Sequence, residues 1–126
     1  MIARMNDLEL LDDPSGVRIV VLRGDHDLST AGALRLALAG AREAGRGVVI
    51  ELSLASFIDS TILGVIIGGL RDCKADARGF SVVASSREDD VVPRLLGLTG
   101  LRAVFPIYES RSAAVEHTAA GRNLPA

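Results

Sequence analysis

Aromatic residues are scarce in this sequence, and their scarcity argues against one large class of partner. They make up 3% of the 126 residues, and there is no tryptophan. Proteins that bind single-stranded nucleic acids stack the bases on such side chains. Fourteen basic residues against 16 acidic ones give a net charge of −2, and the arginines are scattered rather than gathered in a stripe. We therefore expect no nucleic-acid partner.

Cysteine is almost absent as well. Cys73 is the only one, which excludes an intramolecular disulfide and a cysteine-based metal cluster. Its apolar surroundings favour a buried, unreactive thiol. The two histidines, His26 and His117, are far apart in the sequence and do not form an H-x-x-x-H pair. The sequence predicts no metal site and no cofactor.

Long hydrophobic runs are missing too. The longest, residues 62–70, contains three glycines and is too short to cross a bilayer. The first 14 residues lack the continuous apolar stretch of a secretion signal. These absences predict a cytoplasmic protein with no membrane partner, and the length fits one domain.

What the sequence does contain is an alternation of β-branched runs and helical periodicity. The pattern predicts strands at residues 8–11, 17–22, 48–52, 80–84 and 104–108, and helices at residues 29–44, 60–73, 85–100 and 110–118. Gly24 is expected to end the second strand, and Ser85 with Glu88 has the spacing of a capping box that would open the third helix. Pro106 cannot donate to a strand ladder, which predicts an edge position for the last strand.

This order predicts an α/β fold with a mixed, mostly parallel sheet of about five strands packed against about four helices. Residues 1–7 are expected to form a flexible leader, residues 8–120 the domain and residues 121–126 a flexible tail.

Two loops follow strands of the predicted sheet, at residues 24–30 and 54–61. Working sites of parallel sheets lie at the carboxyl ends of the strands. We therefore expect the carboxylates of Asp25, Asp27 and Asp59 to converge with the hydroxyl of Ser60.

Asp59 and Ser60 admit two interpretations. Either side chain could simply cap the following helix, which is worth about 1 kcal/mol. Alternatively, Ser60 accepts a phosphoryl group, which a helix N-terminus stabilises through free amides and the helix dipole. The added charge of about −2 would then repel a partner docked beside Asp27 and Asp59.

The helix that starts at Ser60 carries three glycines that weaken it by roughly 1 kcal/mol each, namely Gly64, Gly68 and Gly69. Such glycines usually permit close approach of another backbone. The domain's own sheet is the first candidate, and a partner is the second.

Three motifs point to a known family. The first, Asp59-Ser60-Thr61, follows a predicted strand and is similar to the motif Asp-Ser-(Ser/Thr)-Gly. The second is GDHD at residues 24–27, where Gly-Glu-hydrophobic-Asp is common. The third is RLLGLTGLRAVFPIY at residues 94–108, which resembles a characteristic passage into the last strand. Over residues 17–120 the sequence thus resembles the STAS domain of anti-sigma-factor antagonists. It departs from the usual pattern at Asp25, where glutamate is common, at His26, where an apolar residue is usual, and at Ile62, where glycine is usual.

The resemblance implies a STAS-like fold and a role in partner switching. Members bind a serine kinase that is also an anti-sigma factor, and thereby free a sigma factor for transcription. The kinase, using ATP that it binds itself, would phosphorylate Ser60, and a metal-dependent serine phosphatase would reverse this. The residues expected to contact the partner are Asp27, Asp59, Thr61, Ile62 and Val65.

Other functions fit the sequence less well. A phosphoaspartate receiver needs a lysine after its last strand, but the only lysine is Lys74. A serine hydrolase is disfavoured because no G-x-S-x-G elbow exists, and no phosphate-binding G-x-x-x-x-G-K-[ST] loop is present. The chain is therefore not expected to be an enzyme. The serious alternative is a STAS module that acts as an adaptor or sensor in a stress-signalling or transporter complex, without phosphorylation.

Overall fold

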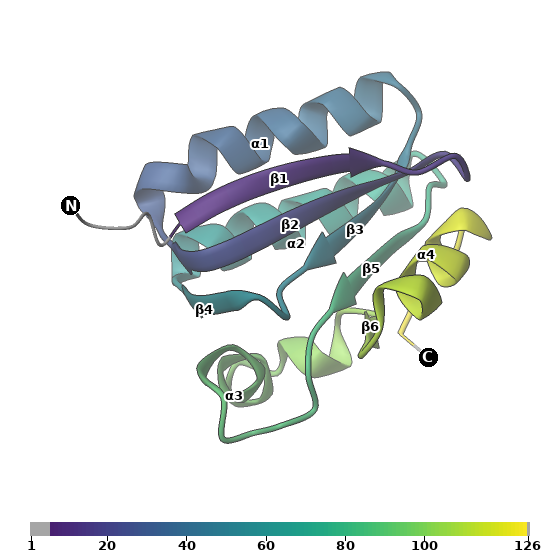
Figure 1. Ribbon diagram of the computed structural model, residues 1–126. Helices are drawn as coiled ribbons and strands as arrows, with labels where there is room; N and C mark the ends of the chain where they lie inside the picture. The colour runs from purple at the N-terminus through teal and green to yellow at the C-terminus, as the bar shows by residue number, and fades with distance from the viewer. Residues whose placement is uncertain (1–5, 126) are drawn as a thin grey trace.

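The computed structural model describes residues 6–125, which form one mixed sheet with helices on both faces (Figure 1). The elements, in chain order, are β1 (Asn6–Asp12), β2 (Val17–His26), α1 (Leu28–Glu43), β3 (Gly47–Glu51), β4 (Ala55–Ile58), α2 (Ser60–Ala75), β5 (Phe80–Val83), α3 (Val91–Leu98), a 3₁₀ turn (Leu101–Ala103), β6 (Ile107–Tyr108) and α4 (Arg111–Ala119). The strand order is β1-β2-β3-β5-β6, with β4 paired to β2. Only β1 is antiparallel to its neighbour, which confirms the predicted fold class.

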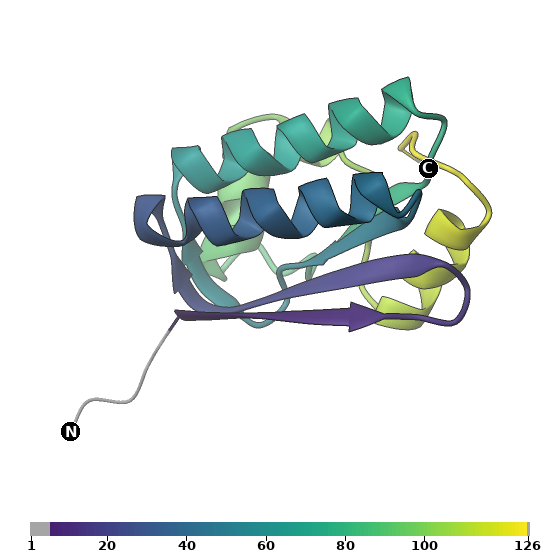
Figure 2. The same cartoon turned by 90° about the horizontal axis from the view of Figure 1, so that it is seen from above.

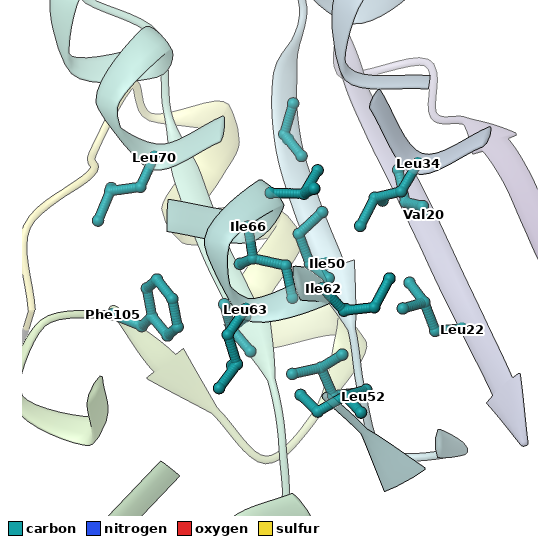
Figure 3. Packing of buried hydrophobic residues seen from close by; sticks show 14 of the residues in the cluster. Val20, Leu22, Leu34, Ile50, Leu52, Ile62, Leu63, Ile66, Leu70 and Phe105 are labelled. Atoms are coloured by element: carbon teal, nitrogen blue, oxygen red, sulfur yellow. The ribbon is translucent and has the colours of Figure 1, made fainter. Parts of the chain in front are cut away.

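Alternation along the strands divides the core between the two faces of the sheet. Residues such as Val20 and Ile50 pack with α1 and α2 in the main apolar cluster, whose close packing Figure 3 shows. Their neighbours Ile19 and Val49 point the other way and belong to a smaller cluster that includes Ala114 of α4. Figure 2 shows α1 and α2 lying side by side and running in the same direction. Both helices therefore begin at the same end of the sheet.

The second strand is longer than predicted. Gly24 does not end β2, because the strand continues to His26. At Gly24 the backbone has a φ of +74°, and the pairing register with β4 shifts between Gly24 and Asp25. The positive φ favours glycine, so the residue that suggested a strand end instead lies inside a continuing strand, and the extra residue of the bulge is Ser56 in β4.

Strand β4 was not predicted, because residues 54–61 were expected to be a loop. Three of its four residues, Ala55, Phe57 and Ile58, pair in parallel with the last residues of β2, beyond the point where β3 ends. The amide of Gly24 also donates to the Leu54 carbonyl over 3.0 Å. The sheet is thereby extended toward the start of α2, and it has six strands in the described residues rather than about five.

The predicted start of the third helix was wrong. Ser85 accepts a hydrogen bond from the amide of Arg87 in a local turn, and α3 begins only at Val91, after Asp90. Pro93 then lies in the first turn, where its missing N–H costs the helix nothing.

Strand β6 lies at the sheet edge, as predicted for the segment with Pro106, but it holds only Ile107 and Tyr108.

Asn6 and Asp7, expected in the leader, belong to β1, while residues 1–5 lie outside the described residues. At the other end, the carbonyl of Arg122 accepts from the Phe80 amide over 2.8 Å. Arg122 of the predicted tail is thus tied to β5, and residue 126 lies outside the described residues.

The α2 glycines do not serve the predicted contact with the sheet backbone. A Cβ atom on Gly64 or Gly68 would meet nothing within 4 Å, and one on Gly69 would meet side chains of Leu38 and Phe80. Gly64 and Gly68 therefore leave a shallow groove between α1 and α2.

Among residues 6–125, no helix combines the length and apolar character needed to span a membrane.

His117 is buried between α4 and the sheet, where its Nδ1 lies 2.8 Å from the hydroxyl of Tyr108. Desolvation lowers the pKa of this imidazole. An unfolded histidine titrates near about pH 6.5, so below that pH the unfolded chain binds more protons than the folded one. The free energy of unfolding should therefore fall as the pH drops from about 7.5 to about 5.5, by at most about 1.4 kcal/mol per pH unit for one proton.

Urea unfolding at these two pH values tests this expectation. The control is His117→Asn, which cannot titrate and should show a smaller loss of stability over the same range. An equal loss in both chains would contradict it.

Candidate functional site

The site lies where α1 and α2 begin, at the carboxyl ends of β2 and β4. His26 and Ile58 are paired across these strands, and the amide of Asp59 donates to the His26 carbonyl over 3.3 Å. The residue directly after each strand is the N-cap of a helix: Asp27 follows β2 and caps α1, and Asp59 follows β4 and caps α2. Strand β4 thus places the two aspartates at the same end of the sheet, while the convergence of their carboxylates with Ser60 stays a prediction.

Asp59, and not Ser60, caps α2. Its Oδ1 accepts a hydrogen bond from the amide of Ile62 over 3.0 Å. Ser60 is the first residue of the helix, its side chain is exposed, and its hydroxyl makes no hydrogen bond within the described part of the chain. Capping therefore leaves the Ser60 hydroxyl free.

Asp27 is held by the first turn of α1. Its Oδ1 accepts from the amide of Ser29 over 2.9 Å and from the hydroxyl of Ser29 over 2.6 Å. These bonds lower the pKa of the Asp27 carboxyl, so it is charged at neutral pH. Asp25, one residue before the buried His26, is exposed at the same end of the sheet.

His26 is buried between these two caps, which accounts for a histidine where an apolar residue is usual. Its Nε2 lies 3.0 Å from the carbonyl of Arg23, and its Nδ1 lies 3.0 Å from the hydroxyl of Thr30 in α1. Because a carbonyl only accepts, Nε2 carries a proton. The ring is thus bonded on both sides, and it fixes the strand end from which both caps project.

The hydroxyl of Ser60 stands in the field of a helix N-terminus. The first intrahelical bond of α2 runs from the amide of Leu63 to the carbonyl of Asp59. The amides of Ser60 and Thr61 precede it, in the region where a helix offers free donors and a partial positive charge. A phosphoryl group on Ser60 would meet these donors, although the Asp59 carboxylate lies on the adjacent residue.

Three of the residues expected to contact a partner lie further along α2. Thr61 is half-buried in the groove between α1 and α2. Ile62 is fully buried, and Val65 is 7% exposed, because both side chains pack in the main core. Ile62 presents no surface to a partner, which is a correction to the sequence-based expectation, whereas the small exposed part of Val65 lines the same groove as Thr61.

The structure also shows surface apolar residues near Ser60 that the sequence did not single out. Phe57 of β4 and Val91 and Leu98 of α3 are exposed and border a depression that reaches Ser60. The sequence placed Leu98 within the third helix but gave no indication that its side chain is exposed.

Asp59 should be replaceable by asparagine without loss of stability, since both side chains cap helices equally well, whereas Asp59→Ala should cost about 1 kcal/mol. Chemical denaturation of the two variants measures this difference. A loss in Asp59→Asn as large as that in Asp59→Ala would show that the charge, rather than the cap, stabilises the fold.

Over most of its length the chain is similar to known proteins. Residues 11–114 match the family model of the STAS domain. A crystal structure of an anti-sigma factor antagonist from Mycobacterium paratuberculosis is 28% identical, with a TM-score of 0.76 over 90% of this chain and 93% of that one. A putative anti-sigma factor antagonist from Thermotoga maritima is 25% identical, with a TM-score of 0.65 over 90% and 94% of the two chains. The Bacillus protein SpoIIAA in its phosphorylated form shares the fold at 18% identity, with a TM-score of 0.67 over 87% and 97%.

Proposed function

The chain belongs to the STAS domain family, and we propose that it is an anti-sigma-factor antagonist controlled by phosphorylation. In its unphosphorylated form it binds an anti-sigma serine kinase, so that a sigma factor is released and transcription is regulated indirectly. The kinase transfers phosphate to Ser60, the complex separates, and a serine phosphatase restores the first form. These partners place its action in the cytoplasm.

The observation that carries this proposal is that two neighbouring residues, Asp59 and Ser60, have different roles. Asp59 provides the helix cap through its bond to the Ile62 amide. Ser60 is left exposed at the first position of α2. A hydroxyl that capped the helix would be engaged in a hydrogen bond and less accessible to a kinase. The Ser60 hydroxyl is exposed and has no capping role.

The proposed switch acts by charge and not by refolding. Phosphate adds about −1.5 to −2 charge units beside Asp59, and Asp27 caps the neighbouring helix. Because like charges brought together in an interface cost several kcal/mol, a kinase that accommodates these aspartates would reject the phosphorylated surface.

We propose no catalytic role for the chain itself. Burial raises the pKa of the Cys73 thiol to about 11, so this cysteine is protonated at neutral pH and is a poor nucleophile. His26 has both ring nitrogens engaged in hydrogen bonds with the backbone and Thr30, which leaves it unable to act as a base for Ser60.

Incubation with candidate anti-sigma kinases and labelled ATP tests the proposal. Label should enter the wild-type chain and be lost in Ser60→Ala. Ser29→Ala is the matched control, because Ser29 is also exposed in a first helical turn but its hydroxyl is bound to Asp27. Label that persists in Ser60→Ala would exclude Ser60 as the sole acceptor. Partner binding without any labelling would favour the alternative of a STAS adaptor or sensor module.

A further inference from the structure

An apolar groove adjoins Ser60 on the side away from α1. It lies between α3 on one side and β4 with the start of α2 on the other, and its volume is about 470 Å³. Figure 1 shows α3 beside β4 at this end of the sheet. The residues of the groove that matter here are Phe57, Ser60, Leu63, Val91, Arg94 and Leu98.

The groove is bordered by large apolar side chains that face water. Phe57 is 45% exposed, Val91 is 55% exposed and Leu98 is 77% exposed. Single exposed apolar residues are common, but a cluster around a hollow marks an interaction surface. The residues that dominate the binding energy of a protein interface typically fill well-packed pockets on the partner, and this groove is such a pocket.

We propose that this groove receives apolar side chains, flanked by basic residues, of the kinase that phosphorylates Ser60. The inference rests on the proposed function and adds the surface by which the kinase holds the chain. Ser60 and Asp59 themselves line the groove. A protein that brings its active site to the Ser60 hydroxyl therefore covers the groove in the same encounter.

Charge around the groove specifies the chemistry of the occupant. Asp59 stands at one wall, and Asp90, directly before α3, is exposed and makes no capping hydrogen bond with its side chain. Asp27 caps the neighbouring helix. Of these acids only Asp59 lines the groove, where Arg94 is the one cation among the lining residues. Arg87, the cation beside Asp90, is already paired with Asp89, so the surroundings of the groove carry more acids than bases. A basic rim around an apolar anchor complements this surface.

The described C-terminal residues do not compete for the groove. Arg122 and Asn123 are bonded to Phe80 and Arg78, at the amino end of β5. The groove lies toward the opposite end of the sheet, where β4 leads into α2.

The first test compares two leucines of equal exposure. Leu98 lines the groove and is 77% exposed, whereas Leu36 of α1 is 76% exposed and does not line it. Calorimetry with the kinase that labels Ser60 should show binding at least about tenfold weaker for Leu98→Ala and for Phe57→Ala, and within about twofold of wild type for Leu36→Ala. Wild-type affinity in Leu98→Ala, with Ser60 still labelled, would overturn the inference while leaving the proposed function intact.

The second test needs no kinase, so it remains decisive if none labels Ser60. The tetrapeptides Arg-Leu-Leu-Arg and Glu-Leu-Leu-Glu are titrated into the isotopically labelled chain. The basic peptide should shift the amide resonances of Phe57, Leu63 and Leu98 and bind at least about fivefold more tightly than the acidic one. Equal affinities, or no shifts at these residues, would overturn the inference.

Occupation of the groove by the chain itself would also overturn it. Removal of residues 1–5 should leave the affinity for the basic peptide unchanged, and so should dilution of the chain. Tighter peptide binding after the truncation would show that the N-terminal segment fills the groove. Tighter binding on dilution would show that a second copy fills it.

Discussion

A Ser60→Asp chain should bind the anti-sigma kinase at least about tenfold more weakly than the wild type. The new carboxylate would stand at the first position of α2, directly after the Asp59 cap. In an interface that excludes water, two adjacent acids repel each other and any acidic group of the partner, and a tenfold loss corresponds to about 1.4 kcal/mol. The helix itself should tolerate the change, because acids in a first helical turn are favourable. Calorimetry on the folded variant measures the effect.

Ser60→Asn is the control for size, because asparagine has nearly the shape of aspartate and no charge. It should lose much less affinity than Ser60→Asp, and it should also fail to accept phosphate. Equal losses in the two variants would show that bulk at position 60 weakens binding, and the charge switch would then be wrong. A loss that disappears at high salt would support the electrostatic origin.

Gly79→Ala should be the most destabilising of the glycine-to-alanine changes in the described part of the chain, because the clash there is the shortest. Gly79 immediately precedes β5, and a Cβ atom there would collide with the carbonyl oxygen of Thr118 and lie 2.7 Å from its carbonyl carbon. Both obstacles are backbone atoms at the end of α4, so neither can move away as a flexible side chain would. We expect a loss of about 3 kcal/mol or more in the free energy of unfolding, measured in urea.

Gly68→Ala provides the opposite case. This glycine is inside α2, and a Cβ atom there would meet nothing within 4 Å. The substitution should raise the free energy of unfolding by about 0.5–1 kcal/mol, the usual advantage of alanine in a helix. If Gly79→Ala were as stable as the wild type, α4 could not pack as closely on the sheet as the structure shows.

The elements with strong local signals were predictable from the sequence. Periodic apolar residues predicted α1 and α2 within two residues at each end, and β-branched runs predicted β2, β3 and β5. The edge position of β6 followed from Pro106 alone, since proline lacks the donor that a central strand needs. Local signals failed at α3, where Ser85 and Glu88 have capping spacing but the chain forms a turn there before the helix.

The polar residues of the candidate site were predictable from the sequence, whereas its exposed apolar residues and the directions of its side chains were not. The sequence alone fixed the type of fold, and it identified Asp27, Asp59 and Ser60, because acids and hydroxyls after strands are a local pattern. Only the tertiary structure decided that Asp59 makes the cap and Ser60 is free, and that Ile62 turns inward while Leu98 faces water. The reason is physical: β4 is a short strand that is stable only through its pairing with β2, and the direction of each side chain depends on partners distant in the sequence.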